Sequence, residues 1–158
     1  RSPRQSHGAR RANARVLDVG CAKGFTLHDF KEMSPGLTTA GVDVSDYAVR
    51  NAIETVKPSL SVGNARDLPF EDSSFDLVLS LSTVHNLPLQ DCKQAIKEIG
   101  RVSRSHAFLT VDAWRNDEEK SRMRDWVLTA YTYMHVDAWK DLFQEVGYTG
   151  DYYWFFVE

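Results

Sequence analysis

The sequence predicts an α/β fold, a doubly wound and mostly parallel β-sheet with helices on both faces. Short apolar runs that are typical of buried strands alternate with helix-like segments along the whole chain, as in successive βαβ units. The first run, residues 16–19, leads through a turn between Gly20 and Gly24 into a helix-like segment. A strand that is apolar on both faces belongs inside a parallel sheet. We therefore expect this strand near the middle of the sheet.

Four further strands follow in order, at residues 38–44, 60–62, 75–81 and 107–111. Each is a short run of apolar or β-branched residues, bounded by breaks such as Pro35-Gly36 and the loop 63–74. A helix after the second strand begins at a Ser45 cap and ends at Lys57-Pro58, because its apolar residues share one face up to Val56. Another helix spans residues 89–99 and ends near Gly100.

The last third of the chain leaves two interpretations open. Apolar residues between Met123 and Met134 recur with helical spacing, which favours a helix, although residues 128–134 also read as a strand. A final helix covers residues 138–146, with Gly147 as its C-terminal cap. Residues 152–157 form a last strand. His106 enters a strand and His135 precedes a helix, so both are expected to be structural.

Length and composition fit one globular domain. The 158 residues are 42% hydrophobic and 26% charged, with a formal net charge of −3. This charge argues against a nucleic-acid-coating surface, and no apolar run reaches membrane-spanning length. Cys21 and Cys92 have neither the spacing of a metal site nor the density of a disulfide scaffold, so a cytoplasmic location and no metal are expected.

Residues 1–14 differ from the rest of the chain. They carry four arginines among Ser, Pro and Gly, show no periodicity and lack the apolar core of a signal peptide. We expect a flexible basic arm at 1–14 and one domain at 15–158.

The turn after the first strand is the main candidate ligand site. Strand, glycine loop and helix together present free backbone N–H groups at a helix N-terminus, and Asp18 fixes a carboxylate beside them. The spacing does not match a phosphate-binding P-loop, because three residues separate Gly20 from Gly24 and Phe25 follows. It also departs from the dinucleotide pattern, since Ala22 stands where the second glycine belongs.

This loop resembles the first motif of the class I S-adenosylmethionine (SAM)-dependent methyltransferases, Asp/Glu-x-Gly-x-Gly-x-Gly. The matching residues are Asp18, Gly20, Ala22 and Gly24, with Cys21 between them. The resemblance implies that this loop contacts SAM. Ala22 stands where the motif has its second glycine. This departure from the motif is mild, because one methyl group still lets the backbone approach a ligand. A strand-to-helix turn without a ligand is the plainer interpretation of the loop by itself.

Asp43 is the second candidate. It follows the glycine loop by about 20 residues, where an acid in a doubly wound sheet can accept both hydroxyls of a ribose. The resemblance assigns Asp43 that role and places Val44 against the adenine. The other interpretation is a surface aspartate near the Ser45 cap.

Residues 63–70, Gly-Asn-Ala-Arg-Asp-Leu-Pro-Phe, match a third family motif. Many members have an acid where Asn64 stands. The Asn64 carbonyl oxygen can still accept a hydrogen bond from the adenine amino group, and Ala65 can offer its backbone N–H to a ring nitrogen. Without the resemblance, the segment is a plain Asn-Ala turn.

The segment after the fourth strand is expected to face the reacting part of the cofactor. Leu81 and Ser82 are the predicted cofactor contacts. His85 is the predicted catalytic residue, because its ordinary pKa suits a general base near neutral pH. A loop histidine that only forms hydrogen bonds is the alternative.

Together these motifs indicate a class I SAM-dependent methyltransferase with a Rossmann-like sheet of order 3-2-1-4-5 plus one or two terminal strands. The predicted cofactor is SAM, with S-adenosylhomocysteine as product, and the predicted acceptor is a small molecule bound by the aromatic residues of 114–139. Because the family usually carries N-terminal helices over the cofactor, a SAM-binding or scaffold module without complete catalysis is the alternative. A nicotinamide-dependent oxidoreductase is disfavoured by the loop spacing.

Overall fold

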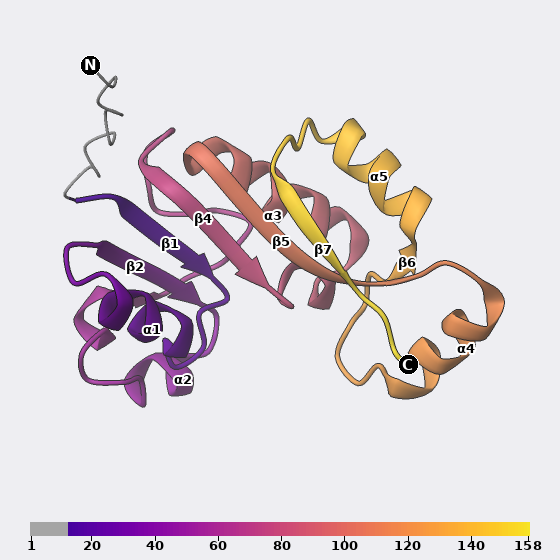
Figure 1. Ribbon diagram of the computed structural model, residues 1–158, viewed down its shortest axis with the longest axis horizontal. Helices are drawn as coiled ribbons and strands as arrows, with labels where there is room; N and C mark the ends of the chain where they lie inside the picture. The colour runs from indigo at the N-terminus through magenta and orange to yellow at the C-terminus, as the bar shows by residue number, and fades with distance from the viewer. Residues whose placement is uncertain (1–12) are drawn as a thin grey trace, which may run out of the picture.

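A computed structural model describes residues 13–158 and contains a seven-stranded sheet (Figure 1). Its order is β3-β2-β1-β4-β5, and β6 and β7 both pair with β5. Every pairing between these strands is parallel. The strands are β1 (Arg15–Val19), β2 (Thr38–Asp43), β3 (Leu60–Val62), β4 (Phe75–Leu81), β5 (Ser103–Trp114), β6 (Met134–His135) and β7 (Asp151–Phe155).

The predicted fold class and the order 3-2-1-4-5 are confirmed, with β1 at the centre. The last strand of the chain, β7, runs parallel to its neighbour β5. The helices that connect the strands are α1 (Phe25–Met33), α2 (Asp46–Arg50), α3 (Leu89–Val102), α4 (Asp117–Trp126) and α5 (Val136–Glu145), with short 3-10 turns η1 (Lys57–Ser59) and η2 (Val84–Asn86). The predicted basic arm, residues 1–14, lies almost wholly outside the described residues.

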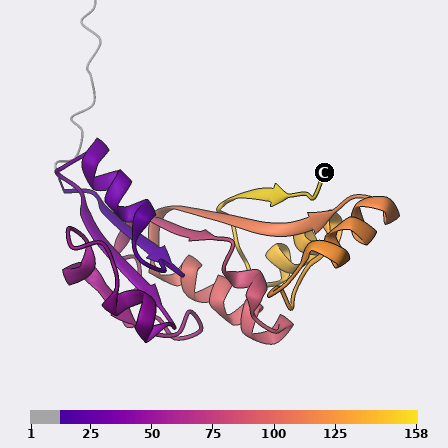
Figure 2. The same ribbon diagram turned by 90° about the horizontal axis from the view of Figure 1, so that it is seen from below.

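Side chains alternate between two cores, one on each face of the sheet. The larger core joins β1, β4 and β5 to α3 and α5, and its largest buried side chain is Trp139. The smaller core lies under α1, where Leu27 packs with Val16 and Leu79. Figure 2 shows α1 on one face of the sheet and α3 with α5 on the other. Both faces of β1 are therefore buried, as its apolar run predicts.

The face that carries α1 is open over β5 and β7. Figure 2 shows no helix over the middle of these two strands on that side, and at the end of β7 Trp126 of α4 packs against Phe155. Tyr153 and Phe155 of β7 are accordingly exposed. The opposite face of the same strands is covered, and there Leu109 and Val111 are fully buried against α3 and α5.

The predicted helix through residues 123–134 is wrong in its second half. Helix α4 ends at Trp126, because Val127 turns to extended backbone angles. The next residues are drawn to the turn after β4, where the N–H groups of Tyr131 and Thr132 both donate to the carbonyl of His85. Leu128 is almost fully exposed despite its helical spacing from Met123. The alternative strand is wrong as well, since only Met134 and His135 pair with β5.

The second predicted helix is also too long. Helix α2 ends at Arg50, and the chain then turns so that Ile53 donates its N–H to the carbonyl of Lys23 in the glycine loop. Helix α3, by contrast, continues through Gly100 to Val102. The predicted caps are confirmed. The Ser45 side chain accepts from the Ala48 N–H, His135 accepts from the Asp137 N–H, and Gly147 has a φ of 70°.

Candidate functional site

The glycine loop leaves β1 at its carboxyl end and folds against β2. The N–H groups of Gly20 and Cys21 both donate to the carbonyl of Val42. Gly20, Ala22 and Gly24 all have positive φ, of 85°, 45° and 80°. A Cβ on Gly20 would overlap the Thr83 side chain, so glycine is required there by neighbour and conformation alike. No side chain caps the N-terminus of α1, which leaves N–H groups free for a ligand.

Asp43 ends β2 directly beside this loop. One carboxylate oxygen accepts the N–H of Ala22 at 2.8 Å, and the other accepts the N–H of Ser45 at 2.8 Å. Each oxygen retains a lone pair for a further donor. The next residue, Val44, is exposed. The structure thus brings Asp43, Val44 and Ala22 together at the carboxyl edge of the sheet, as the sequence predicts for a nucleoside site.

Asp18 and Cys21 are the buried groups of the loop. Burial, with a smaller contribution from the nearby Asp43 charge, raises the pKa of Asp18 to about 7. Burial raises the pKa of the Cys21 thiol to about 12, so this thiol is not reactive at neutral pH. A cation bound beside Asp18 and Asp43 would relieve the repulsion between the two carboxyl groups. The loop therefore suits a positively charged ligand.

Asn64 and Ala65 lie in the turn after β3. The Asn64 side-chain oxygen already accepts two hydrogen bonds from Arg66, from its backbone N–H at 3.0 Å and its Nε at 3.2 Å. Arg66 also donates to Asp91 on α3. An adenine amino group would have to displace the Arg66 side chain to reach that oxygen. Ala65 is half-buried against the larger core.

Leu81 and Ser82 follow at the carboxyl end of β4. Ser82 has a φ of 51°, and its N–H donates to the Thr110 hydroxyl at 2.7 Å on the neighbouring strand β5. Leu81 is half-buried. The carboxyl ends of β1, β2 and β4 therefore place Asp18, Asp43 and Ser82 along one edge of the sheet. Ligands of open α/β sheets bind at this edge, where the strand order reverses about β1.

His85 is buried in η2, and its ring faces Asp112 of β5. Its Nδ1 accepts the Asp112 N–H at 3.2 Å, so the proton of the neutral ring is on Nε2. Nε2 lies 3.6 Å from a carboxylate oxygen of the same Asp112. Burial lowers the pKa of His85 to about 4 and raises the pKa of Asp112 to about 6. His85, the predicted base, is therefore neutral at pH 7, and the lone pair on its Nδ1 already accepts the Asp112 N–H.

A cavity of about 370 Å³ opens beside this pair. Ser82 lies at one side of it, and the Trp126–Ala130 segment and Phe155 form much of the rest; its full lining is Ser82, His85, Asn86, Asp112, Trp126, Val127, Leu128, Thr129, Ala130 and Phe155. Sequence reasoning singled out His85, Ser82 and the aromatic residues of the late connection. It missed Asp112, although an acid in an apolar strand was a usable signal.

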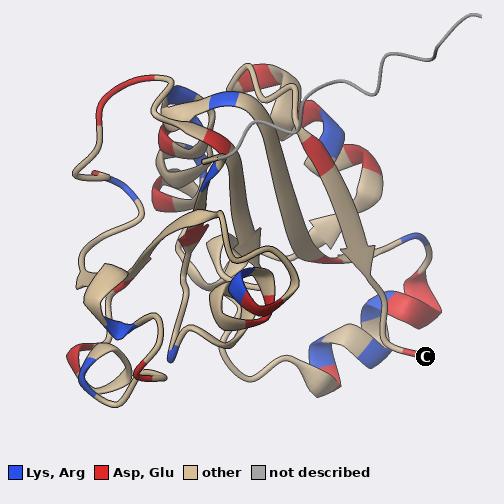
Figure 3. Cartoon of the chain, turned by 60° about the vertical axis from the view of Figure 1, so that its left-hand side comes forward, with Lys and Arg blue, Asp and Glu red and all other residues tan. Residues whose placement is uncertain are grey.

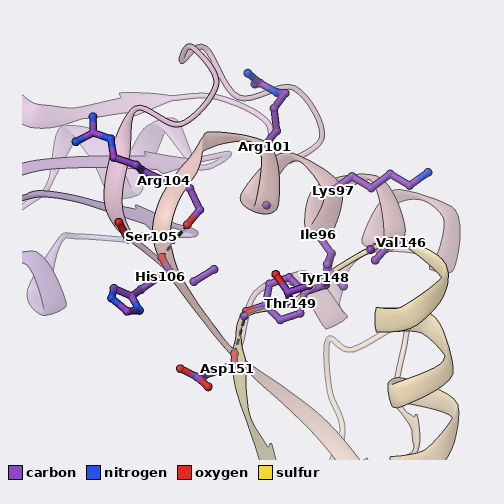
Figure 4. A pocket seen from close by; sticks show the side chains of 15 residues that line it. Ile96, Lys97, Arg101, Arg104, Ser105, His106, Val146, Tyr148, Thr149 and Asp151 are labelled. Atoms are coloured by element: carbon purple, nitrogen blue, oxygen red, sulfur yellow. Dashed lines mark hydrogen bonds between the residues drawn. The ribbon is translucent and has the colours of Figure 1, made fainter.

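A second cavity, of about 480 Å³, lies at the opposite end of the sheet between the start of β5 and the residues before β7. Its basic side chains do not converge. Figure 4 shows Lys97, Arg101 and Arg104 pointing away from the hollow, and the two arginines are already bonded to carboxylates. We therefore assign the functional site to the carboxyl edge. Among residues 13–158, no group of three or more His, Cys, Asp or Glu side chains could hold a metal ion.

The Rossmann-like sheet and the glycine loop are those of the class I SAM-dependent methyltransferase family. The comparison with known families agrees. A family described as "Methyltransferase domain" matches residues 17–111, which is more than half of the chain. The chain therefore belongs to the methyltransferase family.

Individual relatives are similar over part of their length. An uncharacterized protein of Haemophilus influenzae is 30% identical over 155 residues, which cover 90% of this chain and 61% of that protein. Ajmaline N-methyltransferase of Rauvolfia serpentina is 36% identical over 105 residues, 61% of this chain and 34% of the enzyme. A SAM-dependent methyltransferase structure from Methanosarcina mazei shares the fold, with a TM-score of 0.69, 21% identity and coverage of 86% of this chain and 80% of that one. The chain spans less than two thirds of both curated relatives.

Proposed function

We propose that this chain binds SAM at the carboxyl edge of its sheet and transfers the sulfonium methyl group to a small-molecule acceptor, leaving S-adenosylhomocysteine. The observation that carries the proposal is the convergence of the glycine loop with Asp18 and Asp43 at the strand-order reversal. The buried Asp18 carboxyl group and the half-buried Asp43 carboxylate lie beside free loop N–H groups, which suits a ligand that carries both a cationic and a polar part. When bound, SAM supplies a methyl group that its positively charged sulfur makes electrophilic.

Each residue predicted from the sequence has a place in this proposal. Asp43 accepts the ribose hydroxyls, and Val44 lies against the adenine, with Asn64 and Ala65 at its polar edge. Asp18, Cys21, Ala22 and the two loop glycines surround the methionine part, together with Leu81 and Ser82. The chain contributes mainly position and exclusion of water, because a methyl group on a sulfonium needs little further activation.

A small-molecule acceptor is supported by the cavity beside Ser82, whose lining includes the aromatic side chains of Trp126 and Phe155 and the aliphatic side chain of Val127. The charge distribution also favours it. Figure 3 shows Lys and Arg interspersed with Asp and Glu along the same helices, and the formal net charge of the chain is −3. Nucleic-acid binding requires a basic face. Named relatives act on both classes, since one is ajmaline N-methyltransferase and another is a tRNA carboxymethyluridine methyltransferase of Arabidopsis thaliana.

The alternative is a SAM-binding or scaffold module that does not complete the reaction. Its specific support is the uncovered sheet face over β5 and β7, because an open face leaves the acceptor side exposed to water. For compartment, no helix in the described part of the chain is long and apolar enough to cross a membrane. The predicted reducing cytoplasm stays a prediction, and both cysteines are free and buried.

Isothermal calorimetry with SAM, S-adenosylhomocysteine and NAD tests the proposal. We expect the first two ligands to bind and NAD not to bind. Asp43→Ala is expected to weaken SAM binding by roughly ten- to a hundredfold, because two charge-assisted hydrogen bonds to ribose are lost. Asp43→Asn should fall in between, because the amide oxygen can still accept the Ser45 N–H.

Asp46→Ala is the matched control, since Asp46 begins the neighbouring helix α2 and pairs only with Arg50 among the described residues. Its SAM affinity should equal that of the parent. NAD binding with no SAM binding would reject the methyltransferase assignment of the site. Equal SAM affinity of Asp43→Ala and the parent would remove Asp43 from the cofactor site.

A further inference from the structure

The Asp112 carboxyl group faces the cavity and accepts no hydrogen bond from the residues that the structure describes. Its residue is only 4% exposed, and its side chain lines the cavity beside Ser82. Nε2 of His85 lies 3.6 Å from a carboxylate oxygen of Asp112, which exceeds hydrogen-bonding distance. An ionised carboxylate that leaves bulk water without gaining a donor is destabilised. A buried group of this kind calls for a partner that the folded chain does not supply.

The backbone of Asp112 is held firmly, so the position of the carboxyl group is fixed. Its N–H donates to His85, and its carbonyl accepts the indole N–H of the fully buried Trp139 at 2.9 Å. Asp112 also pairs with Phe155 in the β5–β7 register. The backbone therefore keeps this carboxyl group at the cavity wall. A donor for it comes from the cavity, either from water or from a bound ligand.

Aromatic side chains surround the entrance to this carboxyl group. Trp126 and Phe155 both line the cavity, with ring centroids 5.0 Å apart, and both are partly exposed. An aromatic face attracts a cation, and a buried carboxylate attracts it more strongly. Leu128 and Ala130 of the same lining offer apolar contact to the rest of a ligand. A carboxylate, two aromatic rings and an apolar wall are the set of groups that recognises an amine with an apolar body.

We infer that the cavity beside Ser82 binds a small amine as methyl acceptor, with the amine N–H donating to the Asp112 carboxylate and the apolar body against Trp126 and Phe155. The inference rests on the proposed function, because the acceptor must meet the methyl group at Ser82. Asp112 would be a catalytic residue in this arrangement, since it touches the nucleophile. His85 would be a positioning residue, because it fixes Asp112 through the backbone hydrogen bond.

The transfer step is balanced as follows. The amine enters as its ammonium and first gives one proton to water in the cavity. The neutral nitrogen then uses its lone pair to form the new N–CH₃ bond, while the S–CH₃ bond breaks and its electron pair stays on sulfur as a thioether. The nitrogen becomes a positively charged ammonium, and its extra proton leaves with the product or passes to water. Charge on nitrogen develops during the step, so the adjacent Asp112 carboxylate stabilises the transition state more than the ground state.

Matched pairs of amines and alcohols test this inference. The probes are phenethylamine, tryptamine and cyclohexylethylamine, each compared with the alcohol of the same skeleton, by calorimetry at pH 8 with and without S-adenosylhomocysteine. We expect at least one amine to bind the parent protein about tenfold more tightly than its alcohol. Asp112→Asn should abolish that preference, and methyl transfer from SAM to the bound amine should fall at least tenfold.

Asp125→Asn is the control, because it removes the same charge from an exposed side chain next to Trp126. It should keep the preference. Urea unfolding of Asp112→Asn shows whether the variant is folded. No amine binding by the parent at millimolar concentration, equal binding of amines and alcohols, or a preference that survives in Asp112→Asn would each overturn the inference. SAM binding to the parent without any amine preference would leave the proposed function standing, so the two failures are distinguishable.

Discussion

At the scale of single residues, Asp18 is a carboxyl group that folding holds mostly away from water. Its pKa in the folded protein is about 7, against an ordinary value of 3.8. The folded state therefore keeps a proton that the unfolded state has released between about pH 4 and 7, and stability falls as pH rises through this window. Replacing Asp18 with a neutral residue removes this fall in folding stability with rising pH.

We predict that Asp18→Asn raises the free energy of unfolding at pH 8 by roughly 1–3 kcal/mol and has no such effect at pH 4. Urea unfolding at the two pH values measures it. The same variant should bind the cationic SAM more weakly at pH 8 and lose the rise in affinity that the parent shows between pH 6 and 8. A pH-independent SAM affinity of the parent would argue that Asp18 stays protonated in the complex.

His85 is the residue for which sequence and structure give different chemistry. The prediction that it acts as a base stays a prediction, and it requires the ring to release the Asp112 N–H. We expect His85→Ala to lower the methyl-transfer rate by roughly a hundredfold while SAM affinity barely changes. The parent's pH profile from 5.5 to 9 should show no titration of His85, because its pKa lies near 4.

His85→Asn separates the two roles. An asparagine can accept the Asp112 N–H but cannot take up a proton near neutral pH. Recovery of most of the rate in His85→Asn indicates that His85 positions Asp112. An unchanged rate in His85→Ala would remove His85 from the reaction altogether.

At the scale of elements, the glycine loop and the turn after β4 are fitted to each other. We predict that Gly20→Ala lowers the free energy of unfolding by about 2–4 kcal/mol, because the new methyl group meets the Thr83 side chain and the backbone is left-handed there. Gly36→Ala is the control, since nothing lies within 4 Å of its added Cβ, and it should change stability by less than about 0.5 kcal/mol. Equal effects of the two substitutions in urea unfolding would contradict this fit.

At the scale of the whole molecule, the sheet is strongest at its centre and open at its edges. Strands β1 and β4 are paired on both sides and covered on both faces, whereas β3 and β7 have one strand neighbour each. We predict that hydrogen exchange is slowest in β1 and β4 and fastest, among the strands, in β3 and β7. Exchange followed by mass spectrometry measures this order. Protection of β7 equal to that of β4 would show that its open edge or face is covered in solution.

The sequence by itself determined the elements whose signals are local. An apolar run fixes a strand that is buried on both faces, a Ser45 cap fixes the start of α2, and a glycine with positive φ marks the end of α5 at Gly147. The place of the proposed cofactor site also follows from the sequence, because parallel strands bring their carboxyl ends together. Asp18 and Asp43 follow neighbouring strands and lie close enough in the structure for the Asp43 charge to raise the pKa of Asp18.

Only the tertiary structure decided what depends on distant partners. The apolar spacing after Met123 predicts a helix that continues to Met134. In the structure α4 ends at Trp126, and the N–H groups of Tyr131 and Thr132 donate to the carbonyl of His85 instead of to a helix carbonyl. The same packing buries Asp112 against His85, which lowers the pKa of the histidine and raises the pKa of the carboxyl group. Burial and hydrogen bonding set these properties, and both arise between residues that are far apart in the chain.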